Sequence, residues 1–263
     1  MTEDNDRPTK LHPATKARET VDPARLRADG GRTNPVERTV REEHSLDRMR
    51  QTIAKRLSES YSEAVHVTLR RRVNAEPLLE ATERAKEDIE DVSFFDILLR
   101  ALSATLAEHP EFNATYEDGT HQLYDEHNLG IAVDIENGLV TPVLGDVGSK
   151  SLATITEQRR ALVERVQAGE FSMSDFKNGT FTVTNLGPLG VDSFTPIINP
   201  PEIAILAIGR LDERARPGGD GGVTFRRELP LDLSFDHRIV DGADGARFLR
   251  TLAENLETAE RFV

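Results

Sequence analysis

The sequence of 263 residues contains no cysteine, little lysine and no long apolar run. Without cysteine, these residues can form no disulfide bond, no zinc site with thiolate ligands and no cysteine nucleophile. No apolar run approaches the roughly 18 residues that a helix needs to cross a bilayer. The start of the chain, Met1 to Asp6, has neither the basic nor the apolar part of a signal peptide. We therefore expect a soluble cytoplasmic protein with no membrane partner.

Positive charge comes mostly from arginine, and the formal net charge is -13. An acidic balance of this size disfavours binding to nucleic acid and to anionic membrane surfaces. Acid excess with scarce lysine is typical of proteins that stay hydrated in concentrated salt. The composition therefore indicates a halophilic cytoplasm, as in halophilic archaea, and an ordinary acidic cytosolic protein is the alternative. Lysine occurs only at Lys10, Lys16, Lys55, Lys86, Lys150 and Lys177.

The chain divides into an N-terminal arm and one large domain. Residues 1–44 are rich in proline, glycine, arginine and acids and show almost no apolar periodicity. Such a segment cannot bury enough surface to offset its ordering entropy, so we expect it to be mostly disordered. Residues 45–263 are long enough to bury a sizeable core.

Apolar spacing predicts helices and strands that intermix along the domain. The absence of a regular strand–helix alternation favours a mixed α/β arrangement of the α+β sandwich type. The first helix should begin at a Ser45 cap. Helices are expected near 45–57, 76–89, 94–106, 151–167 and 244–257. Strands are expected at 66–73, 115–124 (a hairpin), 129–143 (two segments broken at Asn137-Gly138), 179–185, 203–208 and 229–235.

A histidine directly after an apolar strand carries the chemistry of the sequence. His237 follows the strand, Asp241 lies four residues later, and Gly242 begins a helix. A histidine held at a strand end can take a proton from a thiol and return it to a leaving thiolate. Asp241 can orient the site or pair with an arginine, and Gly242 and Gly245 allow close backbone approach. For a lone histidine, a polar strand-end residue beside a turn is the simpler interpretation.

Five sequence blocks, one of which contains this histidine, favour a catalytic role for it instead. From about residue 45 onward, some four-fifths of the chain resembles the catalytic domain of dihydrolipoamide acyltransferases, the E2 components of 2-oxo acid dehydrogenase complexes. The blocks are Asp236-His-Arg-Ile-Val-Asp-Gly-Ala-Asp-Gly-Ala-Arg-Phe, Gly179-Thr-Phe-Thr-Val-Thr-Asn-Leu-Gly, Gly190-Val-Asp-Ser-Phe-Thr-Pro-Ile-Ile-Asn-Pro-Pro-Glu, Asn128-Leu-Gly-Ile-Ala-Val-Asp with Gly138-Leu-Val-Thr-Pro-Val, and the opening helix Met49-Arg-Gln-Thr-Ile-Ala-Lys-Arg-Leu.

The resemblance implies a chloramphenicol-acetyltransferase-like fold with a mixed β-sheet. It also implies a trimeric building block, which in the family often assembles into cubic or larger cores. The active site would lie in a channel at the subunit interface, where coenzyme A and the lipoyl arm enter from opposite ends. The implied function is acyl transfer between the lipoyl thiol and coenzyme A.

The resemblance also assigns roles to residues. His237 would be the general base, Asp241 its supporting carboxylate, and Thr184 of the neighbouring subunit the hydroxyl that donates to the oxyanion. Many relatives carry serine at this hydroxyl position, so the extra methyl of Thr184 can narrow the site. Asn199 resembles a residue near the coenzyme A channel. His66 matches a family position near the same channel, or else has a structural role.

The remaining sequence signals point to no other chemistry. His109, His121 and His127 are interpreted as surface or turn residues. No metal-ligand spacing, phosphate-binding loop or dinucleotide fingerprint is present, so we expect no metal site.

Nothing in the sequence resembles a lipoyl domain with its Asp-Lys-Ala turn. Residues 17–33 resemble a degenerate remnant of the peripheral subunit-binding domain. The lipoyl group would then act in trans, on a separate chain, on a full-length E2 or as free dihydrolipoamide. Two alternatives stay open: a coenzyme A-dependent acyltransferase with another acceptor, and a structural or regulatory subunit that co-assembles with a full-length E2. Acyl transfer to dihydrolipoamide in high salt, with and without His237, separates the three.

Overall fold

The computed structural model describes residues 38–136, 138–219 and 221–263. Two compact units are found, Met1–Ser45 and Leu46–Val263, and every helix and strand described below lies in the second. The predictions of a disordered arm at 1–44 and of a subunit-binding remnant at 17–33 fall mostly outside the described residues. Residues 38–47 contain no helix or strand.

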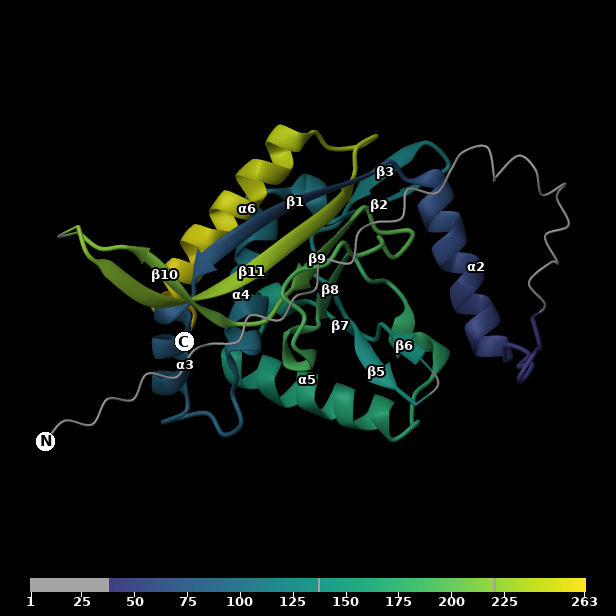
Figure 1. Ribbon diagram of the computed structural model, residues 1–263, viewed down its shortest axis with the longest axis horizontal. Helices are drawn as coiled ribbons and strands as arrows, with labels where there is room; N and C mark the ends of the chain where they lie inside the picture. The colour runs from purple at the N-terminus through teal and green to yellow at the C-terminus, as the bar shows by residue number, and fades with distance from the viewer. Residues whose placement is uncertain (1–37, 137, 220) are drawn as a thin grey trace, which may run out of the picture. The chain divides into compact units, whose positions relative to one another are not determined.

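A mixed sheet of seven strands forms the centre of the larger unit, in agreement with the predicted α+β arrangement (Figure 1). The strand order is β1-β11-β9-β8-β4-β7, and β10 pairs with the outer half of β11. The pairs of β8 with β4 and with β9 are parallel, and the others are antiparallel. The bounds are β1 (His66–Asn74), β4 (Leu129–Ile131), β7 (Val143–Leu144), β8 (Phe181–Asn185), β9 (Ala204–Ile208), β10 (Asp212–Pro217) and β11 (Val223–Asp236).

Helices α4 and α6 lie together against one side of the long β1–β11 pair (Figure 1). Four phenylalanines join them to the sheet: the ring centroid of Phe248 lies 4.7 Å from that of Phe112 and 5.8 Å from that of Phe181, and Phe112 meets Phe235 edge-on at 6.1 Å. These rings are fully buried, and burial of such side chains is the main source of stability. The helix bounds are α2 (Arg48–Glu63), α3 (Glu76–Ala85), α4 (Phe94–Glu108), α5 (Leu152–Gln167) and α6 (Gly242–Glu257).

The two faces of the sheet differ in chemistry because side chains alternate along each strand. On β8, Phe181 and Val183 join the apolar core, whereas Thr182 and Thr184 point to the opposite face. The registers of β8, β9 and β11 place Thr182 level with Ser234 and Thr184 level with Asp232. The second face is therefore lined by hydroxyl and carboxylate groups, and it is the face that can carry chemistry.

Two hairpins lie outside the main sheet. β2 (Ala114–Glu117) and β3 (Thr120–Leu123) form the predicted hairpin, which turns at Asp118 and Gly119 with positive φ angles of 49° and 77°. The predicted pair of extended segments at 129–143 is instead four short strands, because β5 (Val133–Ile135) and β6 (Gly138–Val140) form their own hairpin between β4 and β7. The sequence prediction also missed β10, whose residues are mostly charged.

The predicted Ser45 cap is wrong: α2 begins at Arg48, and the Asp47 carboxylate accepts the Arg50 N–H at 2.7 Å. Aspartate and serine cap helices about equally well, so residue preference alone does not decide between Ser45 and Asp47 as the cap of the helix. Only Ser60 of α2 is buried, and Figure 1 shows the helix standing apart from α4, α5 and α6. Of the apolar residues that predicted this helix, Leu46 and Leu57 are exposed, whereas Met49 and Ile53 are half-buried. The second helix also ends earlier than expected, at Ala85.

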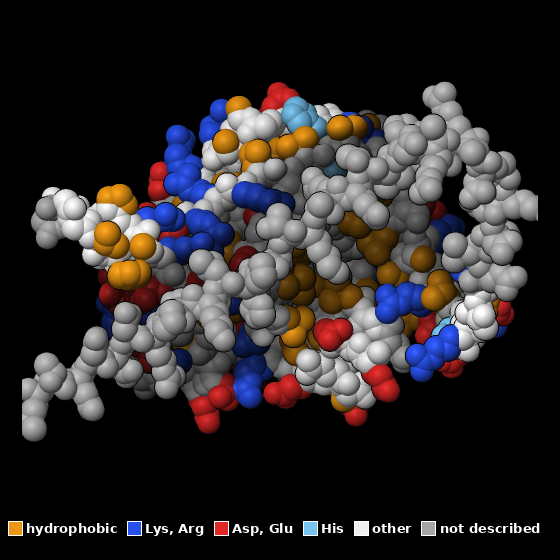
Figure 2. All heavy atoms as spheres, in the orientation of Figure 1, with side chains coloured by type: hydrophobic (Ala, Val, Ile, Leu, Met, Phe, Trp, Pro, Cys, Tyr) orange, Lys and Arg blue, Asp and Glu red, His pale blue; other side chains and the backbone are white. Residues whose placement is uncertain are grey.

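Positive charge gathers on one region of the otherwise acidic chain. Figure 2 shows lysine and arginine side chains grouped where β1, β10 and β11 lie. The arginines on these strands are Arg70, Arg71, Arg72, Arg214, Arg216, Arg226 and Arg227.

No helix within the described ranges is long and apolar enough to span a membrane.

The two glycines at the start of α6 differ in their surroundings. A Cβ atom at Gly245 would lie 2.6 Å from Cε1 of Phe235, so α6 packs on β11 only because this residue has no side chain. Nothing lies within 4 Å of a Cβ at Gly242, so the expected close approach is confirmed at Gly245 and is wrong at Gly242.

We predict that Gly245→Ala lowers the free energy of unfolding by about 1–3 kcal/mol, because the methyl group overpacks a closed contact. Gly242→Ala is the matched control and should be neutral or stabilising by up to about 1 kcal/mol, since alanine favours helix over glycine. Urea denaturation at one protein concentration measures both. Equal losses in the two variants would show that the Phe235 contact is not the cause.

Candidate active site

His237 is the first residue after β11, and the sheet fixes its backbone. Its N–H donates to the Val65 carbonyl at 2.8 Å, so β1 and β11 stay joined up to the histidine. Phe235, two residues earlier, is fully buried, and its ring centroid lies 6.1 Å from the imidazole. The His237 side chain nevertheless remains 38% exposed. A firmly held base that is open to a ligand is what proton transfer requires.

Asp236 and Arg238, on either side of the histidine, form a clasp around the buried Asp236 carboxylate. Arg238 Nε donates to both Asp236 carboxylate oxygens at 3.0 Å, and the backbone N–H groups of Arg238 and Val65 donate to Oδ1 at 3.0 and 3.2 Å. Burial by itself raises the pKa of Asp236, but hydrogen bonds from Arg238 and Val65 outweigh it and hold the pKa below its usual range. The guanidinium also lies over the Tyr116 ring at 4.9 Å. In the sequence this pair appeared only as part of the first family block, with no role of its own.

The structure brings the predicted pair of His237 and Asp241 together. Asp241 is the N-cap residue of α6, and its Oδ1 lies 3.7 Å from Nδ1 of His237. The Asp241 backbone N–H donates to Asp244 Oδ2 at 2.9 Å, which fixes the start of the helix. The Asp241 side chain is 80% exposed, so it faces the same open space as the imidazole.

Thr184 is not brought to His237 within one chain. The two residues stand on strands separated by β9, and the register places Thr184 level with Asp232, five residues before His237. With strands about 4.8 Å apart and about 3.3 Å per residue, the separation is on the order of 15–20 Å. Thr184 is nearly buried, and in the described part of the chain its hydroxyl has no hydrogen-bond partner. A shared site for these two residues therefore needs a second copy of the chain.

Asn199 belongs to a cluster that the sequence did not reveal. Its Nδ2 donates to Oε1 of Glu202 at 3.1 Å, and the Thr182 hydroxyl donates to Oε2 of the same carboxylate at 2.5 Å. Burial raises the pKa of Glu202 to about 7, against the lowering effects of those two hydrogen bonds and of the Arg56 charge. The three residues stand in two of the family blocks, but nothing in the sequence shows that their side chains meet.

His66 pairs in register with Asp236 and so lies beside the clasp. Its Nε2 accepts the Ile198 N–H at 3.2 Å, and its Nδ1 lies 3.2 Å from the Ala64 carbonyl oxygen. The Tyr61 ring lies 5.8 Å away. Both ring nitrogens are therefore used inside the chain, and His66 has no free nitrogen for a ligand in this conformation.

Two of the other histidines are more buried than the sequence suggested. The His109 side chain is only 14% exposed, and its Nε2 lies 2.9 Å from the Thr251 hydroxyl. His127 Nδ1 lies 2.6 Å from the buried Ser103 hydroxyl, and burial lowers the pKa of this histidine. His121 stays in its hairpin, with Nε2 3.2 Å from the Glu111 carbonyl oxygen. Within the described residues, each of the three has its hydrogen-bond partner elsewhere than at His237.

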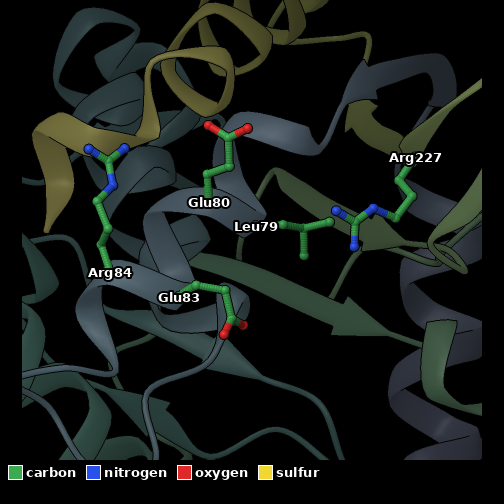
Figure 3. A pocket seen from close by; sticks show the side chains of 5 residues that line it. All are labelled: Leu79, Glu80, Glu83, Arg84 and Arg227. Carbon is green, nitrogen blue, oxygen red and sulfur yellow. The ribbon is translucent and has the colours of Figure 1, made fainter.

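An open hollow of about 510 Å³ lies on α3 beside β11, far from these residues. Figure 3 shows Arg84 and Arg227 on opposite sides of it, with Leu79 between them. It contains none of the predicted site residues and no nucleophile. Among the described residues, no group of three or more histidine, aspartate or glutamate side chains could hold a metal ion. The chemistry of the described chain is concentrated at the end of β11.

Comparisons of the sequence and of the structure with known proteins point to one acyltransferase family. The family model of the 2-oxoacid dehydrogenases acyltransferase (catalytic domain) matches residues 39–263. The dihydrolipoyllysine-residue succinyltransferase component of the 2-oxoglutarate dehydrogenase complex of Bartonella vinsonii subsp. berkhoffii is 37% identical over 231 residues, 85% of this chain and 56% of that protein. The solved dihydrolipoamide acetyltransferase of Azotobacter vinelandii has a TM-score of 0.78 and 31% identity, over 84% of this chain and 93% of that one.

The Azotobacter structure comes from an investigation of a serine, a histidine and an asparagine in the catalytic mechanism of that enzyme. Its asparagine stands four residues after its histidine, as Asp241 stands after His237. A solved chloramphenicol acetyltransferase shares 18% identity at a TM-score of 0.51, over 77% of this chain and 94% of that one, which confirms the expected fold. The chain spans about half, or less, of the length of the first curated relatives it matches (51%, 31% and 40%).

We predict that Glu202→Gln gains stability relative to the natural protein as the pH rises from about 5 to 8. The folded-state pKa of Glu202, about 7, lies above the ordinary value of 4.5, so the folded protein holds a proton that the unfolded chain releases. The natural protein therefore loses stability over this window, by up to about 3 kcal/mol, and the amide does not.

Urea denaturation at pH 5 and pH 8 measures this difference. Glu228→Gln is the matched control, because hydrogen bonds from Arg216 lower the pKa of Glu228 and its stabilising effect is already complete at pH 5. Its difference from the natural protein should stay flat over the window. A flat difference for Glu202→Gln as well would contradict the prediction.

Proposed function

This chain belongs to the 2-oxoacid dehydrogenase acyltransferase family, and we propose that it transfers an acyl group between the thiol of a dihydrolipoyl group and the thiol of coenzyme A. The observation that carries the proposal is His237, held at the end of β11 with its imidazole open and its Nδ1 3.7 Å from Asp241. The sheet thus supplies a fixed base in the family's signature segment.

His237 acts as the general base. Since Nδ1 faces Asp241, Nε2 is the ring nitrogen that takes the proton from the attacking thiol. The thiolate adds to the carbonyl carbon of the incoming thioester, and a tetrahedral oxyanion forms. The oxyanion collapses, and the bond between the acyl carbon and the original thioester sulfur breaks. His237 then returns its proton to the departing sulfur. Asp241 orients the imidazole and balances its positive charge while the proton is held.

Thr184 of a neighbouring copy donates a hydrogen bond to the oxyanion. Two observations support this role: the hydroxyl has no partner within the described residues, and it is too far from His237 to act in its own chain. A donor of this kind commonly contributes about 10²–10³-fold in rate. A second copy of the chain is therefore needed, and the proposal takes from the family resemblance a homotrimer as the smallest active unit, which a larger cubic-type core can repeat.

The dihydrolipoyl group reaches this site from outside the 263 residues, because the sequence holds no Asp-Lys-Ala turn. A separate lipoyl-bearing chain or a full-length E2 is the partner in this proposal. The acyl group stays open, since the matched relatives include an acetyltransferase and a succinyltransferase. The proposal also includes activity at high salt in the cytoplasm, and the acid excess and the scarcity of lysine support the part that concerns salt.

We predict that the protein, in high salt, transfers acetyl or succinyl groups from acyl-coenzyme A to dihydrolipoamide. His237→Ala should lower kcat by about 10²–10⁴-fold, because the thiol proton then has no acceptor. The matched control is His121→Ala, whose ring reaches only the Glu111 carbonyl and which should keep normal activity. Release of free coenzyme A, or acylated dihydrolipoamide detected by mass spectrometry, measures the reaction.

Transfer to a different acceptor, abolished by His237→Ala, would replace dihydrolipoamide in the proposal. An inactive natural protein that joins the core of a full-length relative would contradict the enzymatic function.

A mixture of two inactive variants tests the cross-chain site. Thr184→Ala should lower kcat by about 10²–10³-fold, and His237→Ala more strongly. Unfolded together and refolded at equal concentration, the two variants should recover activity at about one quarter of the sites, because a random mixture places an intact His237 beside an intact Thr184 at that frequency. If the activity of the mixture does not exceed the mean of the separate variants, the two residues do not meet across an interface.

A further inference from the structure

Glu202 has an enclosed position built around its carboxylate. The residue is nearly fully buried two residues before β9, and both of its oxygens accept hydrogen bonds, from Asn199 and from Thr182. A Cβ atom at Gly179 would lie 2.6 Å from Oε1, and one at Gly130 would lie 2.9 Å from the Thr182 hydroxyl oxygen. Glycine at these two places leaves the room that the carboxylate and its partner occupy.

The carboxylate fixes which way the Asn199 amide points. Oε1 of Glu202 faces Asn199, and Oε2 faces the Thr182 hydroxyl. Whether the group is ionised or carries its proton on Oε2, Oε1 remains an acceptor and selects the NH₂ end of the amide. With Nδ2 directed to Glu202, the carbonyl oxygen Oδ1 points the other way. Asn199 is partly exposed, and Oδ1 has no partner in the described ranges. The chain therefore presents a single oriented acceptor to the outside.

This acceptor lies on the face of the sheet that carries the reactive hydroxyl. Asn199 Nδ2 is 3.4 Å from the Thr182 hydroxyl oxygen, and Thr182 and Thr184 are two residues apart on β8 with side chains on the same face. Alternate residues of a strand are about 7 Å apart. An arm that delivers its thiol or thioester to Thr184 passes within reach of Asn199.

We propose that Glu202 is a positioning residue that orients Asn199 to accept a hydrogen bond from an amide N–H of the thiol-bearing arm. This inference rests on the proposed acyl transfer, because it assigns a recognition contact to the same site. The pantetheine arm of coenzyme A and the lipoyl arm both carry such an N–H group. The shared chemistry is an amide several bonds from the sulfur, and the experiment separates the two sources.

A purely structural role does not account for the carboxylate. The nearest cation is Arg56 on α2, and its Nη2 donates to the Pro200 carbonyl at 2.7 Å and not to Glu202. A buried carboxylate without a direct ion pair weakens the fold, and an uncharged side chain of similar volume would cost less. What the carboxylate does supply is an acceptor for the two donors, Asn199 and Thr182.

A double-mutant cycle tests the coupling between the two residues. Asn199→Ala and Glu202→Ala should each raise KM for one arm about three- to tenfold, the size of one hydrogen bond, with kcat changed less than twofold. The double variant should be no worse than Asn199→Ala, because Glu202 acts only through Asn199. Glu202→Gln should keep KM near normal, since its oxygen can accept from Asn199 while its NH₂ donates to the Thr182 hydroxyl.

KM is measured separately for coenzyme A and for dihydrolipoamide, and the one that rises identifies the arm. Asn255→Ala is the matched control: this amide donates to Thr105 Oγ1 within the packed helices, so its loss should lower stability and leave both KM values unchanged. Kd values for the same two ligands, measured by calorimetry, allow the same double-mutant cycle to be calculated from binding alone, without any catalysis. The coupling is then visible even if no acyl transfer is found, and the two failures are distinguishable.

Multiplicative effects of the two alanine variants on KM and Kd would overturn the proposal, and so would an effect confined to kcat. Unchanged KM and Kd values in Glu202→Ala would do the same. If Glu202→Gln behaves like Glu202→Ala while the calorimetric coupling is absent, the carboxylate serves the fold alone.

Discussion

Asp236 is a buried carboxylate at the last position of β11, and its hydrogen bonds decide where the strand ends and the site begins. Arg238 turns back onto it, and the Val65 N–H ties it to the segment before β1. The residue between the two members of this clasp has no freedom to move its backbone. His237 therefore points out of a rigid frame, although it lies at the point where a strand becomes a turn.

The rest of the site extends from that frame. Phe235 inside the core sets the distance between β11 and α6, and Gly245 lets the helix come close enough to place its first turn beside the histidine. Asp241 reaches Nδ1 of His237 because it caps that helix. The apolar half of each strand thus determines the geometry that the polar half uses. Alternate residues of one strand therefore have different tasks: one set packs in the core and stabilises the fold, and the other set lines the site.

Much of this arrangement could be predicted from the sequence where local patterns suffice. The strand beginning at His66, the helix from Phe94, the hairpin at Asp118-Gly119 and the position of His237 at a strand end all follow from spacing, turn chemistry or the family blocks. The distance between Thr184 and His237 across the sheet and the contacts of Glu202 depend on how strands far apart in the sequence pair, about which composition says nothing. The charged strand β10 was missed because its pairing with β11, and not apolar alternation, makes it a strand.

The separation of Thr184 from His237 across the sheet has a geometric consequence for any assembly built from this chain. If each chain gives its histidine to one site and its threonine to the next, the sheet itself is the spacer between successive sites, at on the order of 15–20 Å. A flexible tether of about 30 residues has a root-mean-square reach of roughly 30 Å. One swinging group could then visit neighbouring sites in turn without its anchor moving, and the supply of substrate would be shared around the ring.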